Sequence, residues 1–574
     1  MKLFFKLLLL IPINIESSFF NSKAIVHPEI GANGMVVSQH YLATEAGHSI
    51  LAAGGNAYDA SIAVAFALAV VLPRAGNIGG GGFMVMFDAD TNETLSVDYR
   101  EAAPALATKD MFLQQDGSVD RKRATQGILS IGVPGTVYGM WEVHKRFGSM
   151  AWSELLNPAI KLAKDGFVVS PFMADALNKR YQKLSQYKNF HRIFYPNYPI
   201  KMDQLLTQPE LAKTLETIAT NGAKGFYEGE IAEKIDKHMS ENGGLITKKD
   251  LRDYRPIWRE VVKGSYDDYE IVTMGPPSSG GIHIIQMLNI LEKHDLVSLG
   301  HNSSTYAALL TEVMKYAYAD RSKYLGDPDF FDVPVETLIS KAYATEINKR
   351  IKLNVITASD KILPGAAMQN ESLDTTHFSV ADKHGNVISN TYTLNSGYGS
   401  GIIINDTGIL MNNEMDDFVS APGVPNQFGL VGDEANKIEP FKRPLSSMTP
   451  TLILQDGRPI YATGSPGGSR IITTVLQFLI NTLDFKMEIS DATVAPRIHH
   501  QWKPDILMLE TGFDIHHAND IEALGQKIYF SGPGTSLESI EIKNNLYYGF
   551  GDTRRPDSKA VSYTHLTLPT ILLV

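Results

Sequence analysis

The chain has 574 residues, of which 44% are hydrophobic and 20% are charged, so it can bury a large core in one large or several smaller domains. Its formal net charge of -11 is a mild acidic balance, and no Lys/Arg-rich run occurs, so we expect a small-molecule or peptide partner and no nucleic acid. Because the chain has no cysteine, disulfides and catalytic or metal-binding thiolates are excluded.

The N-terminus, MKLFFKLLLLIPINIESSFFNSKA, is typical of a bacterial secretory signal. Lys2 and Lys6 precede the apolar residues 7–15, and small residues flank Lys23 at the usual cleavage spacing. A membrane-anchoring helix is the alternative, but polar residues and Pro12 interrupt the segment well short of the roughly 20 apolar residues that a span needs. We therefore expect residues 1–24 to be a signal peptide and the mature protein to be periplasmic or secreted, with no membrane attachment.

The first part of the mature chain predicts helices and then strands around a glycine-rich loop. Residues 47–73 have helical apolar spacing with a break at GGN, which indicates a helix, a turn and a buried helix. The loop PRAGNIGGGG then leads into an apolar strand at residues 83–87, and the segment TLSVDYRE indicates another strand. A phosphate-binding loop is disfavoured, because no Lys-Ser/Thr pair follows the glycines and they precede a strand.

The remainder predicts a helical middle, a break and a strand-rich end. Residues 152–343 have amphipathic periodicity, and residues 355–374 form a polar linker. Beyond it we expect strands at residues 375–381, 387–394, 402–404, 451–455 and 461–463, with helices at residues 469–480 and 490–495. No internal repeat is evident. This order favours a layered α/β architecture over a regular βαβ alternation.

The strand after the linker begins abruptly at DTTHFSV. Its period of two places Thr375, His377 and Ser379 on one face. A turn centred on His384 gives a symmetric hairpin in which the two residue numbers of each pair add up to 768, so Thr393 is expected opposite Thr375. A slip of one residue would turn every side chain to the other face.

The position of Thr375 after a linker suggests a chemical role. A threonine hydroxyl is a poor nucleophile unless a base is adjacent, and the α-amine of a chain-terminal threonine, with a reference pKa of about 7.7 to 8.0, is such a base. While Thr375 is bonded to Asp374, that nitrogen is an amide and cannot accept a proton. Cleavage before Thr375 would activate it. An ordinary threonine-rich strand remains the alternative at this point.

Nine motifs resemble, in order and at fitting spacing, those of the gamma-glutamyltranspeptidase family, and bacterial periplasmic members in particular. They are GGNAYDA at residues 54–60, AGNIGGGGF at 75–83, DYREAAP at 98–104, PPSSGGIH at 276–283, DTTHFSV at 374–380, YTLNSGYGSGI at 392–402, LMNNEMDDF at 410–418, KRPLSSMTPT at 442–451 and GSPGGSRI at 464–471. The resemblance extends over about residues 26–560.

The resemblance implies an N-terminal-nucleophile hydrolase with a four-layer αββα sandwich, made as one precursor that cuts itself. On this chain the cut would fall between Asp374 and Thr375, by attack of the Thr375 hydroxyl on the Asp374 carbonyl and hydrolysis of the resulting ester. It would yield a large subunit, residues 25–374, and a small subunit, residues 375–560, associated as a heterodimer. The family implies no cofactor and no metal.

The resemblance also implies a role for each site residue. Thr375 would be the nucleophile, Thr393 would orient it, and the backbone N–H groups of Gly467 and Gly468 would hold the oxyanion. The remaining residues would bind the γ-glutamyl group: Arg100, Ser446 and Ser447 its α-carboxylate, and Asn395, Glu414 and Asp417 its α-ammonium. An arginine suits the carboxylate because its planar fork can donate two parallel hydrogen bonds.

The activity implied is transfer of the γ-glutamyl group of glutathione or a similar amide to water, an amino acid or a peptide, through an ester on Thr375. Two alternatives stay open: an acylase of the same superfamily acting on glutaryl side chains of β-lactams, and an exported binding protein without turnover. An acylase would not need the ammonium-binding residues. The sequence leaves open the physiological donor and acceptor, the ratio of hydrolysis to transfer, and the oligomeric state.

Two positions depart from the family pattern. The loop at residues 420–436 resembles the lid of bacterial members, but Phe428 stands where a tyrosine is typical, so a hydrogen bond from its hydroxyl is lost. Asp374, at the expected cleavage site, is also not the typical residue, and we expect it to affect the rate of self-cleavage.

Three other features carry less chemistry. Ser465 lies in GSPGG, but residue 463 is threonine, so the G-x-S-x-G elbow is absent. The pairs His499-His500 and His516-His517 lack metal-ligand spacing, because adjacent residues of a strand point to opposite faces. Residues 561–574 resemble the translation of a sequencing adaptor, so we expect a non-native tail there; an apolar tail packed on the core is the alternative.

Overall fold

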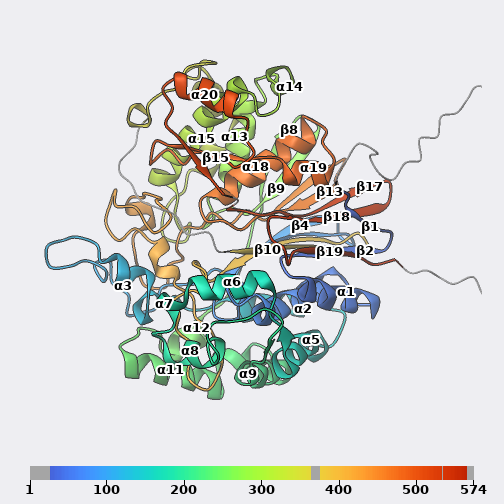
Figure 1. Ribbon diagram of the computed structural model, residues 1–574, viewed down its shortest axis with the longest axis vertical. Helices are drawn as coiled ribbons and strands as arrows, with labels where there is room; N and C mark the ends of the chain where they lie inside the picture. The colour runs from blue at the N-terminus through green and yellow to red at the C-terminus, as the bar shows by residue number, and fades with distance from the viewer. Residues whose placement is uncertain (1–25, 363–374, 533, 565–574) are drawn as a thin grey trace, which may run out of the picture.

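The computed structural model describes residues 26–362, 375–532 and 534–564. Two antiparallel sheets of seven strands lie face to face at its centre, with helices outside each (Figure 1). The first sheet contains, in spatial order, β1 (Glu29–Gly31), β18 (Leu546–Gly551), β17 (Glu538–Lys543), β13 (Arg458–Thr463), β12 (Thr451–Gln455), β9 (Tyr269–Thr273) and β8 (Val262–Tyr266). The second contains β19 (Lys559–Ser562), β2 (Gly34–Ser38), β10 (Thr376–Asp382), β11 (Val387–Thr393), β3 (Gly81–Asp88), β4 (Glu93–Asp98) and β7 (Ile257–Arg259).

Different helices cover the two outer faces. α1 (Tyr41–Ala52) and α2 (Ala57–Val71) lie on the second sheet, and α13 (Gly280–Leu291) and α18 (Arg470–Leu483) share a core with the first (Figure 1). The expected αββα sandwich is therefore confirmed. Residues on either side of position 375 contribute strands to both sheets, so the two expected subunits share one fold.

The other elements complete the two helical layers and two small sheets. The helices are α3 (Arg121–Thr125), α4 (Thr136–Phe147), α5 (Trp152–Asp165), α6 (Pro171–Lys179), α7 (Tyr181–Leu184), α8 (Lys188–Phe194), α9 (Pro209–Asn221), α10 (Lys224–Tyr227), α11 (Gly229–Asn242), α12 (Lys248–Asp253), α14 (Leu296–Leu299), α15 (Ser304–Tyr324), α16 (Val335–Leu338), α17 (Lys341–Asn348), α19 (Ile489–Val494) and α20 (Ile515–Ala523), with 3-10 turns η1 (Ile128–Ser130), η2 (Ser359–Lys361), η3 (Glu414–Asp417) and η4 (Glu434–Asn436). The small sheets are β14 (Ile498–His499), β15 (Leu507–Glu510) and β16 (Ile528–Ser531), and β5 (Phe167–Val168) with β6 (Leu205–Leu206).

The helix α2 shows how local sequence and burial agree. Asn56 caps its N-terminus: its side chain accepts from the N–H of Asp59, whose carboxylate accepts from the N–H of Asn56. All fifteen residues of α2 are buried, because one side contacts β10 and β11 and other sides contact α1, α4 and α5. The expected helix, turn and buried helix at residues 47–73 are confirmed.

Several expected elements differ from the structure. The expected strand at residues 402–404 is wrong: Ile403 forms only a single bridge with Leu410. The middle of the chain is not wholly helical, because β7, β8 and β9 interrupt it; β8 and β7 each form an edge of one sheet, and β9 lies between β8 and β12. In β8 the buried positions alternate with accessible ones, a strand pattern that the charged residues around it obscured.

The sequence predicts a signal peptide at the N-terminus and a non-native tail at the C-terminus, and the structure describes only part of these two segments. The expected signal peptide lies outside the described residues. Within the described ranges, no helix is long and apolar enough to cross a membrane. Val561 and Ser562, expected to begin a non-native tail, pair with β2 as part of β19, and Tyr563 is buried. Residues 565–574 lie outside the described part of the chain, so the origin of the tail stays a prediction.

Candidate active site

The β10–β11 hairpin places two threonine hydroxyls together at its open end. Its register pairs Thr376 with Tyr392 and Ala381 with Val387, which confirms the expected symmetry about His384. Thr375, directly before β10, has its Oγ1 3.4 Å from the Oγ1 of Thr393. Ser389, on the same face of β11 as Thr393, donates from its hydroxyl to the carbonyl of Thr463 in the first sheet. This face of the hairpin therefore points toward the first sheet, and both threonine hydroxyls lie between the two sheets.

The glycine-rich loop supports this hairpin from the side. Asn77 donates from Nδ2 to the carbonyl of Thr393 at 2.8 Å, and its Oδ1 accepts from the N–H of Gly80 at 2.9 Å. A Cβ on Gly80 would lie 2.0 Å from the carbonyl oxygen of Thr393, so only glycine permits this approach. The glycine-rich loop, which was not expected to bind phosphate, thus packs against the strand that contains Thr393.

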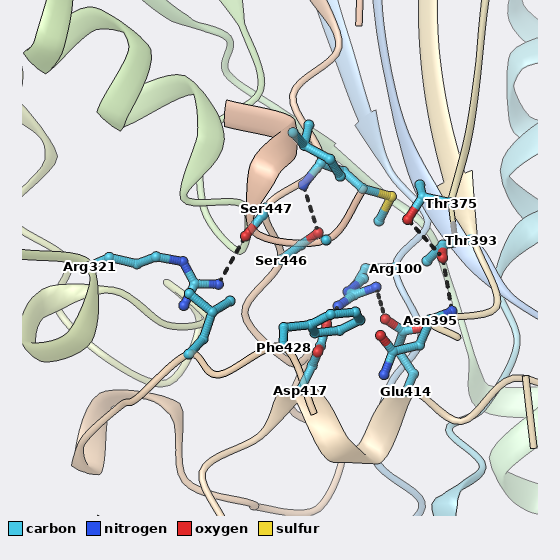
Figure 2. A pocket seen from close by; sticks show the side chains of 14 residues that line it. Arg100, Arg321, Thr375, Thr393, Asn395, Glu414, Asp417, Phe428, Ser446 and Ser447 are labelled. Carbon is cyan, nitrogen blue, oxygen red and sulfur yellow. Dashed lines mark hydrogen bonds and ion pairs between the residues drawn. The ribbon is translucent and has the colours of Figure 1, made fainter. Parts of the chain in front are cut away.

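A small cavity opens in front of the two threonines and brings most of the expected site residues together (Figure 2). Its walls are Arg100, Arg321, Thr375, Thr393, Asn395, Glu414, Asp417, Phe428, Leu430, Ser446, Ser447, Met448, Gly468 and Ile471. Gly467 precedes Gly468 in the same loop. Asp374 lies outside the described residues.

Arg100 is fully buried and already bound to carboxylates. Its Nη1 donates to Glu414 and its Nη2 to Asp417 at 2.6 Å, while Glu101 lies 3.5 Å from Nη1. Its Nε donates to the carbonyl of Pro444 at 3.2 Å. Burial opposes the charged guanidinium, but the three carboxylates outweigh it and raise the pKa of Arg100. Arg100 is therefore always cationic, and in this state it binds the expected ammonium ligands.

The single positive charge of Arg100 cannot neutralise three carboxylates. Burial raises the pKa of Glu414 well above its usual value, against the effect of Arg100, and the charges of Glu101 and Asp417 raise it further. Burial likewise raises the pKa of Glu101 to about 7 and raises that of Asp417. We conclude that the cluster keeps at least one proton near neutral pH.

A second buried cation, Arg321, was not expected from the sequence. Its Nε donates to Ser279 Oγ at 3.0 Å and its Nη2 to Ser447 Oγ at 3.2 Å. Burial lowers its pKa to about 10, so it stays charged at neutral pH. Arg321 lies on α15, whose amphipathic pattern gave no sign of a site residue. Among the described residues it has no carboxylate within 4 Å, so its charge faces the cavity uncompensated at close range.

The two serines lie beside these arginines. Ser446 Oγ accepts from the N–H of Met448 at 3.1 Å, and its carbonyl accepts from the hydroxyl of Ser279 at 2.8 Å. Ser447 meets Arg321 in the same wall (Figure 2). Asn395, on the side of Thr393, donates from its N–H to Thr393 Oγ1 at 2.8 Å and from Nδ2 to the carbonyl of Asn413 at 3.0 Å.

The backbone at Gly467 and Gly468 is in the positive-φ region, with φ of 129° and 56°. A Cβ on Gly467 would lie 2.4 Å from Thr535, and one on Gly468 would lie 2.7 Å from the ring of Phe428. Larger residues are therefore excluded at both positions. This close packing leaves the backbone N–H groups as the candidate donors to an oxyanion.

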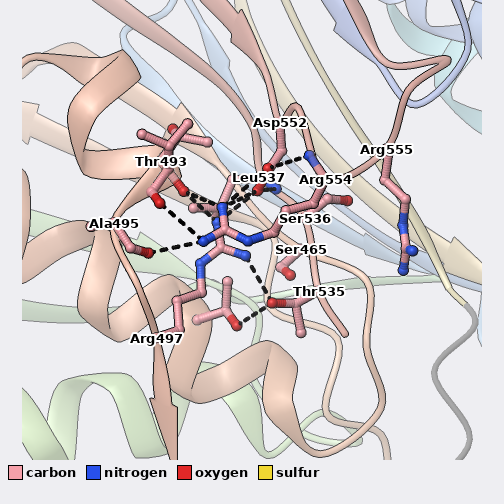
Figure 3. A network of polar contacts seen from close by, with 12 residues as sticks. Ser465, Thr493, Ala495, Arg497, Thr535, Ser536, Leu537, Asp552, Arg554 and Arg555 are labelled. Atoms are coloured by element: carbon pink, nitrogen blue, oxygen red, sulfur yellow. Dashed lines mark hydrogen bonds and ion pairs between the residues drawn. The ribbon is translucent and has the colours of Figure 1, made fainter. Parts of the chain in front are cut away.

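A polar network holds Thr535 against this loop from behind (Figure 3). Thr535 Oγ1 accepts from Arg497 Nη1 at 2.8 Å and from the hydroxyl of Thr474 at 3.0 Å. Arg497 in turn pairs with Asp552 at 2.6 Å. Because each buried polar group has a partner, the network can fix the loop without an orphaned charge.

The loop at residues 420–436 covers the cavity. Phe428 is buried, and its ring lies against Gly468. Asn426 donates from Nδ2 to Asp417 at 3.1 Å, and the N–H of Gln427 donates to Asp416 at 2.9 Å. The loop is thus tied to the same turn, η3, that binds Arg100.

The histidine pairs have ordinary partners. His499 contacts Thr473 at 2.8 Å, and His500 contacts Asp505 at 3.1 Å. His516 and His517 lie in α20, not in a strand as the expectation assumed. Within the described residues, no group of three His, Cys, Asp or Glu side chains could hold a metal ion.

Comparison with known proteins yields one consistent family. The family described as Gamma-glutamyltranspeptidase matches residues 43–562. A glutathione hydrolase proenzyme of Escherichia coli strain K12 is 48% identical over 543 residues, which is 94% of this chain and 93% of that protein. A crystal structure of cephalosporin acylase from Bacillus halodurans is 26% identical, with a TM-score of 0.85 over 96% of this chain and 99% of that one. A crystal structure of Helicobacter pylori gamma-glutamyltranspeptidase is 46% identical, with a TM-score of 0.57 over 61% of this chain and 99% of that one.

Proposed function

The chain belongs to the gamma-glutamyltranspeptidase family, and on that premise we propose that Thr375 becomes its catalytic nucleophile by self-cleavage of the Asp374–Thr375 bond. The protein is a glutathione hydrolase and gamma-glutamyltransferase. The observation that carries the proposal is the position of Thr375, which precedes β10 with its hydroxyl beside Thr393 and lines the cavity.

Cleavage would be an attack of the Thr375 hydroxyl on the carbonyl carbon of Asp374. The peptide C–N bond breaks, the α-amine of Thr375 takes the proton, and water hydrolyses the new ester. The freed amine is then the base beside the hydroxyl.

Turnover would follow a ping-pong course. The Thr375 hydroxyl attacks the γ-amide carbonyl, the α-amine carries the proton to the leaving amine, and a γ-glutamyl ester forms. The N–H groups of Gly467 and Gly468 would donate to the oxyanion; removing such a donor typically costs about 10² to 10³ in rate. Water or an acceptor amine then cleaves the ester.

Substrate recognition is proposed from charge. The γ-glutamyl group has one free carboxylate and one free ammonium, and the cavity has two guanidinium groups and a cluster of carboxylates. We assign the carboxylate to Arg100 with Ser446 and Ser447, and the ammonium to Glu414, Asp417 and Asn395. Binding would require Arg100 to exchange some of its contacts with Glu414 and Asp417 for the ligand. Glutathione and similar γ-glutamyl amides would be donors, and amino acids or dipeptides acceptors.

We also propose that the two products of cleavage, residues 25–374 and 375–560, remain associated, because both contribute strands to both sheets. Export to the periplasm or medium is proposed from the signal-like residues 1–24.

Intact-mass analysis and N-terminal sequencing of the purified protein test the proposal. We expect two chains, one beginning at Thr375, and release of amine from a γ-glutamyl anilide. An uncut chain that still turns over this substrate would refute it. The structural likeness to a cephalosporin acylase supports testing the acylase alternative as well. That alternative predicts that a glutaryl anilide, which lacks the ammonium, is turned over faster than the γ-glutamyl anilide.

A further inference from the structure

Gln501 joins the lid to the oxyanion loop through one side-chain amide. It lies just after β14 and its side chain is only 3% exposed. Its Nε2 donates to the carbonyl oxygen of Phe428 at 3.0 Å, and its Oε1 accepts from the hydroxyl of Ser469 at 2.6 Å. Ser469 directly follows Gly467 and Gly468, so the amide spans from the lid tip to the residue next to the expected oxyanion donors.

The other attachments of the lid tip lead elsewhere. Asn426 and Gln427 bind Asp417 and Asp416, which belong to the turn η3, and Gln427 Oε1 accepts from the hydroxyl of Ser396 at 2.9 Å. Of the hydrogen bonds that residues 426–428 make to the rest of the described chain, the bond to Gln501 is the one that reaches the oxyanion side. It therefore ties the backbone of Phe428 to the loop that contains Gly468.

The chemistry of Phe428 makes this bond important. A phenyl ring has no polar atom, so no hydrogen bond can fix it, and its position depends on packing and on its own backbone. Its ring touches Gly468, where it would exclude water from the site of the oxyanion. A small shift of the Phe428 carbonyl would move the ring away from the glycine.

We propose that Gln501 is a positioning residue that holds the lid closed on the oxyanion loop, and thereby controls access of water to the γ-glutamyl ester. The proposal rests on the proposed function for its effect on the reaction, but its structural part does not. Gln501 touches no expected reacting atom. It acts through Phe428 on one side and through Ser469 on the other.

The main test uses Gln501→Met, which keeps the side-chain length and removes the hydrogen bonds to Phe428 and Ser469, together with those that the same amide makes to His499 at 3.0 Å and to the carbonyl of Lys503 at 3.2 Å. Hydrogen exchange of the lid peptide, residues 420–436, should become about 3- to 10-fold faster, since a typical hydrogen bond contributes that factor to an opening equilibrium. With a γ-glutamyl anilide, KM should rise by a similar factor. The ratio of transfer to hydrolysis at fixed glycylglycine should fall about 3- to 10-fold.

A matched control is Gln208→Met in the large-subunit region. Gln208 is similarly buried, at 5% exposure, and its Nε2 also donates to a backbone carbonyl, that of Val70 at 2.9 Å. We expect it to lower thermal stability as Gln501→Met does, with no change in lid exchange or in the ratio. Gln501→Glu is the second variant: it keeps the acceptor for Ser469 but cannot donate to Phe428, and should shift the ratio in the same direction.

Unchanged lid exchange in folded, processed Gln501→Met protein would overturn the proposal. So would faster exchange without a change in KM or in the ratio, because the lid would then not gate water. Failure of the proposed function is distinguishable: the wild-type chain would remain uncut or inactive, whereas the exchange measurement would still report the bond between Gln501 and Phe428.

Discussion

Two regions of the cavity are built on opposite physical principles. The recognition wall, formed by Arg100, Glu101, Glu414 and Asp417, is crowded with buried charges that already bind one another. The nucleophile corner, formed by Thr375 and Thr393, contains two neutral hydroxyls 3.4 Å apart. The charged groups of the wall are in place as the chain folds, whereas in our proposal the corner gains its base only when the bond before Thr375 is cut. The comparison teaches that the groups for binding can be assembled before cleavage, while the proposed reactivity must wait for it.

The largest effect is expected from Thr375→Ala. This substitution removes the nucleophile of both cleavage and turnover, so the chain should remain uncut and activity should fall by about 10⁴-fold or more. Intact mass and release of amine from a γ-glutamyl anilide measure both. The recognition wall should survive, so binding of glutamate by calorimetry should persist. Loss of binding together with cleavage would break the separation between the two regions.

Arg100→Lys tests the recognition wall. A lysine keeps the charge but cannot reach two carboxylates and a carbonyl with a planar fork, and partner charges would be left buried. We expect KM for the γ-glutamyl donor to rise roughly 30- to 1,000-fold, with thermal stability reduced. Steady-state kinetics and a melting curve measure the two effects. Normal self-cleavage is expected, and a variant that folds but fails to cut itself would contradict the separation.

Thr393→Val tests the nucleophile corner. It keeps the shape of the residue but removes the hydroxyl beside Thr375 and the acceptor for the N–H of Asn395. We expect kcat to fall roughly 10- to 100-fold, the loss of one or two hydrogen bonds, with KM changed by less than about threefold. The matched control is Thr391→Val, on the same face of β11, whose hydroxyl contacts His377 instead. An equal loss of kcat in both variants would refute a specific role for Thr393.

The smallest effect is a pH dependence of stability from the recognition wall. Burial raises the pKa of Glu101 to about 7 in the folded state, above its unfolded value near 4.5. The folded state therefore binds more protons between these values, and stability falls as pH rises through this window, by at most about 1.4 kcal/mol per pH unit for one group. Glu101→Gln should flatten this fall between pH 5 and 7. Unfolding curves in denaturant at several pH values measure it, and an unchanged slope would show that Glu101 is not the group that titrates.

Much of the fold was predictable because local and tertiary preferences agree. The helices α2 and α18 and the strands β3, β12 and β13 follow hydrophobic patterns that burial then satisfies. The strands β7 to β9 were missed, since charged side chains on accessible positions weaken their pattern. The expected strand at residues 402–404 failed because no neighbouring chain offers it more than one bridge.

The candidate site divides in the same way. Motif resemblance identified residues that the fold brings to one cavity from the β10–β11 hairpin, from η3 and from the loops that contain Arg100, Phe428, Ser446 and Gly468. Arg321 and Gln501 were not found, because each lies in a segment whose pattern is explained by burial alone. Their significance depends on what they face, Ser447 in one case and the lid carbonyl in the other.

By itself the sequence predicted the symmetric hairpin, because a turn centred on His384 places Thr393 opposite Thr375, and the observed register and the contact between the two hydroxyls agree with it. It also determined the inventory of charges available to a γ-glutamyl ligand. Only the tertiary structure decided that Arg100 is bound to Glu414 and Asp417, that a second arginine enters the cavity, and that Gln501 holds the lid. The reason is physical: hydrogen-bond register is local to the strand pair, whereas burial and charge pairing depend on segments hundreds of residues apart.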